Sequence, residues 1–313
     1  MDKPCFHQVT FELRPRPPFR LDLTTWALRR RARNLLDTWD GRYRRPVLID
    51  GVPIAIEVVQ DGPREDPTLT VAATASTELS STLLPSVRAV VERLLGLQVD
   101  LDPFYDLADA HPRLRPLKDR FLGVKPPRFP AMFEALANAV ANQQLSLEVG
   151  IELLNRLTSK FGTPVFPGNS ATKTFPEARS VAGASTGELR DLGFSNSKAQ
   201  YLIGLADVVS SGDLDFDQLE SMGRADATRS LQRLHGIGRW SAEYVLLRGA
   251  GRLDVFPSDD VGARNKLQRL LALPCPPSYR EIVTVLDCWH PYAGLVYFHL
   301  LLDGLAERGV LEV

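Results

Sequence analysis

The stretch Leu234-His235-Gly236-Ile237-Gly238-Arg239-Trp240-Ser241-Ala242-Glu243-Tyr244 decides the fold of this chain. Its glycines, Gly236 and Gly238, permit a tight turn between two helices. They also let backbone N–H groups come close to a phosphate, where the positive end of the next helix adds attraction. Such contacts bind nucleic acid without reading its bases. The same pattern also occurs in an ordinary turn between packed helices, and at this point both interpretations stay open.

The charge around this turn favours contact with nucleic acid. Residues 231–270 contain more basic side chains than acidic ones, whereas the whole chain has a net charge of −1. A local basic excess is the expected electrostatic footprint of a phosphate-binding face. The basic residues are Arg233, Arg239, Arg248, Arg252, Arg264, Lys266 and Arg269, and the acidic ones are Glu243, Asp254, Asp259 and Asp260.

A pair of acids, Asp259 and Asp260, stands directly before a helical pattern that begins at Val261. An aspartate in this place most often caps the helix with its side chain. One carboxylate is enough for a cap, so the other is free to face a cleft. There a negative charge stabilises a cationic sugar during cleavage of a glycosidic bond. The local sequence leaves both roles open.

The first part of the chain, residues 1–118, has the pattern of an α/β domain with an antiparallel sheet. Asp50-Gly51 between two apolar runs predicts a hairpin turn, and helices are expected near 26–39 and 83–95. The arginines at 29–31 and 42–45 are typical of a solvated surface. Apolar and polar residues alternate, as in strands, at 8–13, 46–49, 53–59 and 69–73.

From residue 119 onward the pattern becomes helical, and the region 119–313 is expected to be all-α. Several prolines between 116 and 130 mark the transition. Downstream, apolar residues recur at helical spacing, with Ser146 as a cap, Gly162 as a stop signal and another helix beginning near Ser195. The predicted fold class is therefore α+β, an N-terminal antiparallel α/β domain followed by a helical region.

The composition is that of a globular protein, with 44% hydrophobic and 24% charged residues. The apolar runs are too short for a membrane span, and the first residues lack the apolar core of a signal peptide, so a cytoplasmic protein without membrane contact is expected. The cysteines Cys5, Cys275 and Cys288 and the scattered histidines lack metal-ligand spacing. No metal and no cofactor are expected, and the protein is expected to be a monomer.

Taken together and in order, these motifs resemble the helix-hairpin-helix DNA glycosylases of the 3-methyladenine DNA glycosylase II kind. The resemblance implies two helical lobes with the active-site cleft between them, and double-stranded DNA with damaged bases as the partner. Gly236, Ile237, Gly238 and Arg239 would then bind the DNA backbone. The matching stretches are the one from Leu234 to Tyr244, Asp254 to Asp260, Asn142-Gln143-Gln144-Leu145-Ser146, Leu192 to Ser195 with Lys198-Ala199, and Trp289-His290-Pro291-Tyr292.

Residue by residue, the resemblance implies that Asp260 is the essential carboxylate and that Asp259 is a supporting neighbour or a cap. Trp240 and Tyr244 would line the pocket for a flipped base. Related enzymes that also nick DNA have a lysine at the position of Trp240, so the tryptophan implies a monofunctional hydrolase that uses water and leaves an abasic site. Gln144 stands where the family places a side chain that fills the gap left by the flipped nucleotide; otherwise it only caps a helix junction.

Two departures from the family pattern concern this pocket. Val261 stands where the best-known member has an aromatic residue, and Leu301 stands in register with an aromatic of the last helix, so a less aromatic pocket is expected. Alkylated purines of the 3-methyladenine and 7-methylguanine type, excised from duplex DNA in base excision repair, are the expected substrates. Deaminated or oxidised purines are the nearest alternative. A non-catalytic DNA-binding protein, with Asp260 only as a cap, is another.

Overall fold

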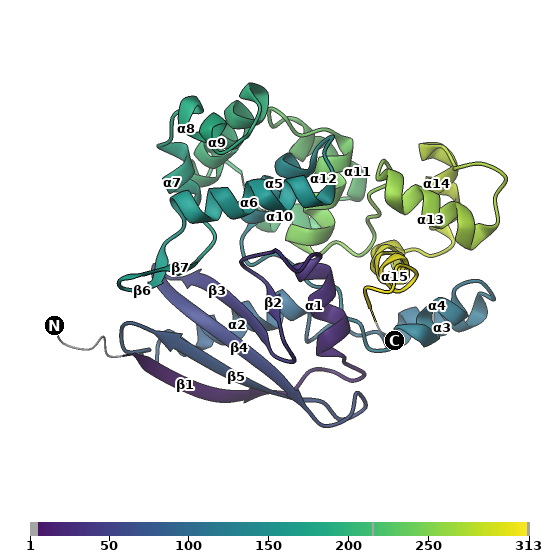
Figure 1. The fold of residues 1–313 in the computed structure, drawn as a ribbon. Coiled ribbons are helices and arrows are strands. Elements are labelled where there is room, and N and C mark those ends of the chain that lie inside the picture. Colours follow the sequence, from purple (N-terminus) through teal and green to yellow (C-terminus); the bar gives the residue numbers. More distant parts are fainter. Residues whose placement is uncertain (1–5, 215, 312–313) are drawn as a thin grey trace.

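The computed structural model describes residues 6–214 and 216–311. Figure 1 shows a sheet formed by the N-terminal part, a group of helices above it, and a second group of helices beside it around the C-terminal end. Cys5 lies outside the described residues, and Cys275 and Cys288 are exposed free thiols. Within the described residues, no helix is both long enough and apolar enough to cross a membrane.

The N-terminal part contains a five-stranded antiparallel sheet in the order β1-β5-β4-β3-β2, which confirms the predicted sheet. The predicted turn joins β3 to β4, and Asp50 and Gly51 have φ values of 50° and 78°. Positive φ at both positions is what a two-residue hairpin turn requires. The strands are β1 (His7–Leu13), β2 (Thr38–Trp39), β3 (Tyr43–Ile49), β4 (Val52–Asp61) and β5 (Thr68–Ala75).

One face of the sheet is covered by α1 (Leu21–Arg29) and α2 (Leu84–Leu95). Alternate residues of β5 are buried, because successive side chains of a strand point to opposite faces. Val71 of the sheet and Val87 and Leu94 of α2 are fully buried in this cluster. Each such side chain contributes about 1.5–3 kcal/mol. This hydrophobic layer holds α1 between the sheet and the helices.

The helix expected near 26–39 is wrong in both of its limits. It begins at Leu21 and ends at Arg29, because Arg30 has a φ of 54° and leaves the helical conformation. The Asn34 side chain then donates to the carbonyl oxygens of Leu28 and Arg29, which have no acceptor role within the helix at its end. Residues 30–37 therefore form an irregular segment.

The rest of the chain is mainly helical, as predicted. Ser146 and Ser195 cap their helices by accepting from Val149 N and Lys198 N, and Gly162 ends α6. The helices are α3 (Asp102–Ala110), α4 (Arg115–Arg120), α5 (Met132–Asn142), α6 (Leu147–Phe161), α7 (Ala178–Ala182), α8 (Thr186–Asp191), α9 (Asn196–Ser211), α10 (Phe216–Ser221), α11 (Arg224–Gln232), α12 (Arg239–Val245), the π-helical turn η1 (Leu246–Ala250), α13 (Val261–Leu271), α14 (Tyr279–Asp287) and α15 (Ala293–Ala306).

The expectation that 119–313 is all-α is wrong at one place. A hairpin of β6 (Pro164–Phe166) and β7 (Asn169–Lys173) follows α6. Gly168 has a φ of 78° and allows the chain to reverse between the two strands. The segment between Gly162 and Ala178 contains the helix breakers Pro164, Pro167, Gly168 and Pro176, so its backbone groups pair as a small ribbon instead.

The helices pack in two hydrophobic clusters. One contains α5, α6, α9, α11 and α12, and the other contains α13 and α15 together with α3 and α4. Phe104 of α3 and Leu117 of α4 are buried beside Leu302 of α15. Helix α3 precedes the predicted boundary at residue 118 and α4 crosses it, but both share the core of the C-terminal helices. The boundary itself stays a prediction.

Candidate active site

The Asp260 carboxylate both caps α13 and faces open space. Its Oδ1 atom accepts a hydrogen bond of 2.9 Å from Ala263 N, and its Oδ2 atom accepts one of 3.3 Å from the Tyr297 hydroxyl. The side chain is half-buried and lines two cavities. Asp260 therefore combines the two roles that the sequence leaves open, helix cap and cleft-facing carboxylate. Its Oδ1 atom is bound by a backbone amide, so Oδ2 can face the cavities.

The two cavities meet at Asp260 and Trp240. The first, here called the hairpin cavity, has a volume of about 790 Å³ and lies between the α5–α6 loop and the start of α12. The second, the aromatic cavity, has a volume of about 320 Å³ and contains Tyr244 and Tyr297 in its wall. The Trp240 and Tyr244 rings are stacked, with centroids 5.4 Å apart and planes inclined by 24°. Both predicted pocket residues thus lie beside Asp260.

Tyr297 of α15 was not predicted as a site residue. Leu301, one turn later, also lines the aromatic cavity, but Tyr297 supplies the aromatic ring and the hydroxyl that reaches Asp260. Burial, with the nearby Asp260 charge, raises the pKa of Tyr297 well above its usual value, so the hydroxyl keeps its proton. The signal in the sequence is a tyrosine on the same helical face as Leu301.

The glycines of the hairpin have different roles. Gly236 has a φ of 88°, and a Cβ atom there would overlap the ring of Tyr201. Gly238 has a φ of −82°, and nothing lies within 4 Å of a Cβ atom built on it. Gly238 is the N-cap of α12, where the first backbone N–H groups have no acceptor within the helix. Between the glycines, Ile237 is buried and fixes the hairpin to the core.

The α5–α6 loop is tied to this hairpin. Gln143 Nε2 donates to Gly236 O at 2.8 Å and to Ser241 Oγ at 2.9 Å. Lys198 Nζ in turn donates to Gln143 O at 2.7 Å. The next residue, Gln144, is exposed in the wall of the hairpin cavity with a φ of 55°, a conformation that is uncommon outside glycine. The loop therefore presents Gln144 on a fixed support.

Arg239 and Asp259 form an ion pair at the entrance of the hairpin cavity. The guanidinium donates to both carboxylate oxygens, at 2.7 and 2.9 Å, and lies 3.7 Å from the ring centroid of Tyr279. Asp259 therefore supports Arg239, which is one of the two roles expected for it, and Asp260 caps α13 instead. The backbone N–H of Arg239, in the first turn of α12, has no acceptor within the helix and is available to an anion.

Glu243 is a buried acid that sequence reasoning missed. Its Oε2 atom accepts from Ser258 N at 2.8 Å, and its Oε1 atom accepts from the Tyr279 hydroxyl at 3.2 Å. Burial raises the pKa of Glu243 to about 7. The carboxyl group fastens the segment before Asp260 to α12. The sequence signal that could have identified Glu243 is its position as a glutamate in the mainly apolar run after Trp240.

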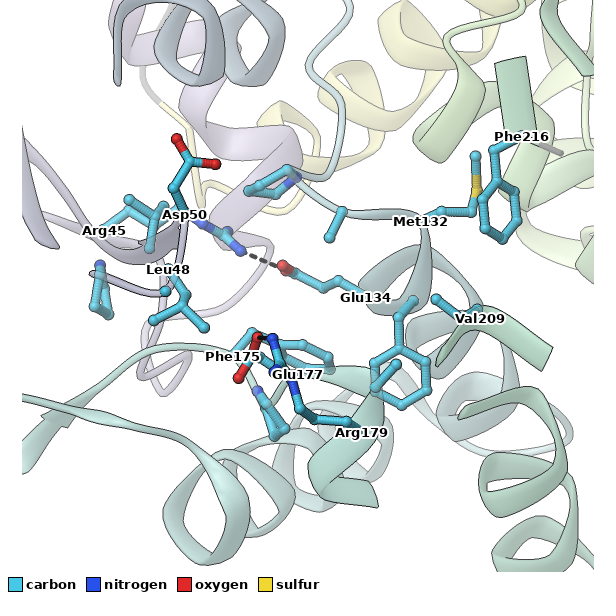
Figure 2. Close-up of a pocket in the computed structure, with 18 residues that line it drawn as sticks. Arg45, Leu48, Asp50, Met132, Glu134, Phe175, Glu177, Arg179, Val209 and Phe216 are labelled. Atoms are coloured by element: carbon cyan, nitrogen blue, oxygen red, sulfur yellow. Dashed lines mark hydrogen bonds and ion pairs between the residues drawn. The ribbon is translucent and has the colours of Figure 1, made fainter. Parts of the chain in front are cut away.

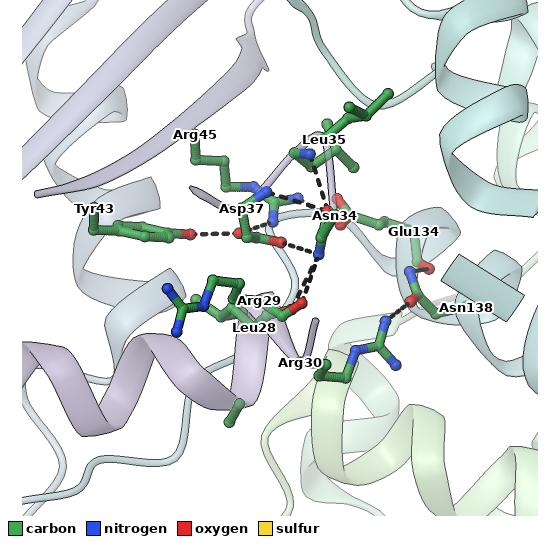
Figure 3. Close-up of polar contacts among 12 residues, drawn as sticks. Leu28, Arg29, Arg30, Asn34, Leu35, Asp37, Tyr43, Arg45, Glu134 and Asn138 are labelled. Atoms are coloured by element: carbon green, nitrogen blue, oxygen red, sulfur yellow. Dashed lines mark hydrogen bonds and ion pairs between the residues drawn. The ribbon is translucent and has the colours of Figure 1, made fainter. Parts of the chain in front are cut away.

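The N-terminal part also contributes to the site. Arg30, which follows α1, donates to the Tyr244 hydroxyl at 3.3 Å and to Asn138 Oδ1 at 2.6 Å. Figure 3 shows the contact of Arg30 with Asn138, and in the same region Arg45, which pairs with Asp37 at 2.6 Å and also with Glu134. The expectation that these arginines are solvated is wrong for Arg30 and Arg45, which are 8% and 1% exposed.

A third cavity, of about 570 Å³, lies between the β3–β4 hairpin and the helices α5 and α7. Figure 2 shows Arg45, Leu48 and Asp50 toward one end of it and Met132, Val209 and Phe216 toward the other, with the Arg45–Glu134 ion pair between them. None of the predicted site residues lines it. In the part of the chain that the structure describes, no group of three or more His, Cys, Asp or Glu side chains is placed to hold a metal ion.

Comparison with known proteins places this geometry in a family. Residues 137–291 match the family described as HhH-GPD superfamily base excision DNA repair protein. The chain is 31% identical to a DNA-3-methyladenine glycosylase of Bacillus subtilis over 210 residues, which are 67% of this chain and 69% of that protein.

Solved structures agree with this match. The 3-methyladenine DNA glycosylase of Archaeoglobus fulgidus has a TM-score of 0.80 and 26% identity, covering 93% of this chain and 97% of that one. The Schizosaccharomyces pombe 3-methyladenine DNA glycosylase, in complex with abasic DNA, has a TM-score of 0.53 and 25% identity, covering 62% and 92%. The chain belongs to the HhH-GPD superfamily of base excision DNA repair proteins, which confirms the family resemblance.

Proposed function

We propose that this protein is a monofunctional DNA glycosylase that hydrolyses the bond between a flipped, damaged base and its sugar. The observation that carries the proposal is the position of Asp260 at the junction of two cavities, next to the stacked Trp240 and Tyr244 rings. A stacked aromatic wall suits a base extruded from the duplex. A fixed carboxylate beside it suits the cationic sugar that forms as the bond breaks.

In the proposed reaction, the C1′–N bond breaks and its electron pair leaves with the base. The Asp260 carboxylate stabilises the cationic sugar, or accepts a proton from the water whose oxygen bonds to C1′. Ala263 N–H and the Tyr297 hydroxyl hold the carboxylate in position. The products are a free base and an abasic site.

Double-stranded DNA is the proposed partner, held by the hairpin. Gly238 carries no side chain, so a phosphate can approach the N–H groups at the start of α12. Ile237 and the Arg239 backbone belong to the same contact. Gln144, in its left-handed conformation at the hairpin cavity, is proposed to fill the space that the flipped nucleotide leaves in the duplex.

Alkylated purines of the 3-methyladenine and 7-methylguanine type are the proposed substrates. The support is the names of the relatives, several of which are 3-methyladenine glycosylases. A methyl group on the ring nitrogen makes such a purine cationic and weakens its bond to the sugar. A carboxylate and an aromatic wall are then sufficient for its excision.

The test is excision of 3-methyladenine and 7-methylguanine from methylated duplex DNA by Asp260→Asn. Asparagine still caps a helix, so the variant should fold, while the charge is lost. We expect the excision rate to fall at least about 100-fold with DNA affinity retained. Asp259→Asn is the matched control and should keep most of the activity. Normal excision by Asp260→Asn would show that Asp260 is not the catalytic carboxylate, and binding without excision by the wild type would favour a non-catalytic DNA-binding protein.

Borohydride trapping tests the absence of lyase activity. Trp240 has no amine for a Schiff base, so we expect no covalent adduct between the protein and a damaged duplex. Among the described residues that line the two cavities, Lys266 is the lysine. An adduct that forms with the wild type and disappears in Lys266→Met would show that the protein is bifunctional.

A further inference from the structure

The Lys266 side chain lies in the aromatic cavity with no acceptor of its own. It extends from α13 toward α15, where a Cβ atom on Gly304 would overlap its Cε and Nζ atoms. The glycine thus leaves the room that the amine occupies. Lys266 is half-buried and, within the residues that the structure describes, makes no hydrogen bond or ion pair. A half-buried donor without a partner is available to a ligand in the cavity.

The charged groups around this cavity are mostly positive. Asp260 is the acid among the described lining residues, against five basic ones. Other contacts already occupy several of these basic side chains. Arg31 pairs with Glu148 at 2.6 Å, and Arg248 donates to Ala27 O at 2.8 Å. The basic lining residues are Arg30, Arg31, Arg248, Lys266 and Arg308.

This charge balance matters for the base that leaves. A cationic base departs as a neutral molecule and needs no help from positive charge. A neutral base departs with the electron pair of the broken bond, so negative charge develops on its ring. In a cavity shielded from water, a hydrogen-bond donor with positive charge stabilises that developing charge strongly. The basic lining therefore assists neutral bases and does nothing for cationic ones.

We propose that Lys266 is a specificity-determining residue that donates to an acceptor atom of the flipped base and extends the substrate range to neutral damaged purines. A purine with a carbonyl oxygen on the edge that enters the cavity fits this donor, and among such purines the charge of the departing base decides how much the donor helps. The inference rests on the proposed function and concerns the same cavity. Burial, and the charge of Arg308, lower the pKa of Lys266, which makes its N–H groups stronger donors.

The experiment compares two substrates under single-turnover conditions: duplexes with hypoxanthine, a neutral base, and with 7-methylguanine, a cationic one, each opposite cytosine. The variant Lys266→Met keeps the length of the side chain and removes its charge. Lys160→Met is the matched control, because Lys160 is an exposed lysine of α6 that lies 3.8 Å from Glu188. Asp260→Asn is included to test the proposed function separately.

We expect Lys266→Met to excise hypoxanthine about 10- to 100-fold more slowly than the wild type, with 7-methylguanine excision unchanged or faster. The control should show the wild-type ratio. An equal change on both bases, or no change, would overturn the inference. If the wild type excises neither base, or Asp260→Asn excises both normally, the proposed function fails instead, and the inference fails with it.

A second variant keeps the test decisive if Lys266→Met does not fold, which circular dichroism would show. Gly304→Ala leaves the lysine in place but puts a methyl group where its Cε and Nζ atoms lie. Alanine favours the helical conformation more than glycine does, so α15 should form normally. We expect the ratio of hypoxanthine to 7-methylguanine excision to fall in this variant as well. An unchanged ratio would count against the role of Lys266.

Discussion

Glu243 places a carboxyl group with a pKa of about 7 at the junction of α12 and the segment that carries Asp260. Its ordinary pKa is 4.5, so the folded state binds the proton more tightly than the unfolded state does. The stability from this group is complete below pH 4.5 and is lost as the pH rises through 7. The difference corresponds to about 3 kcal/mol.

Glu243→Gln should remove this dependence. A glutamine side chain can still accept from Ser258 N and contact Tyr279, but it does not ionise. We expect the variant to match the wild type near pH 4.5 and to exceed it by about 3 kcal/mol at pH 8, as measured by urea unfolding. Glu152→Gln, at a half-exposed acid of α6 that pairs with Arg156 on the surface, is the control. Parallel curves for Glu243→Gln and the wild type would contradict the burial argument.

At the scale of residues, the motif predicted which side chains meet but not all of their neighbours. Asp260, Trp240 and Tyr244 lie within one short stretch of chain, and their spacing brings them to the same cavity. Tyr297 and Lys266 join them only because α13 and α15 pack against each other. That packing depends on helix faces from distant parts of the chain, which local spacing does not encode.

Among the elements, the hairpin offers a comparison between its two glycines. Gly236→Ala forces a side chain into the left-handed region and against the Tyr201 ring, which should cost about 2 kcal/mol or more. Gly238→Ala meets no atoms, so its stability should change by less than about 1 kcal/mol.

The effects of these variants on binding should differ from their effects on stability. We expect Gly238→Ala to weaken binding to an undamaged duplex about tenfold, because its methyl group stands between the α12 N–H groups and a phosphate. Fluorescence anisotropy at fixed salt measures this. Wild-type affinity in the folded Gly238→Ala variant would mean that the hairpin does not contact the DNA backbone.

The ends of a helix could be predicted from the sequence where a local residue caps or terminates the helix. Ser146 and Gly162 fix the two ends of α6, and both were identified. The end of α1 was missed because Arg30 adopts its conformation through contacts with Asn138 and Tyr244, more than 100 residues away. The β6–β7 ribbon was missed because its strands are short, and such runs carry little periodicity.

For the whole molecule, α+β composition and the antiparallel sheet were predictable, but the junction between sheet and helices was not. Arg45 of β3 is buried between Asp37 and Glu134 of α5. A buried charge is tolerated only with partners, and removing one of them costs about 3–5 kcal/mol. This cluster forms only when three distant segments of the chain come together. The local sequence around Arg45 therefore predicts an ordinary surface arginine and not a buried ion pair.

The reach of Arg30 from the end of α1 to the Tyr244 hydroxyl has a consequence for how the protein can change over time. The wall of the aromatic cavity, which is the proposed base pocket, is shared between the sheet-bearing part and the helices. Substitutions around α1 can therefore retune which lesions are accepted while the hairpin and the acid at position 260 remain untouched. We therefore expect residues of the amino-terminal part to influence which damaged bases are excised. A shortened protein that contained only the helices would leave this wall open to water.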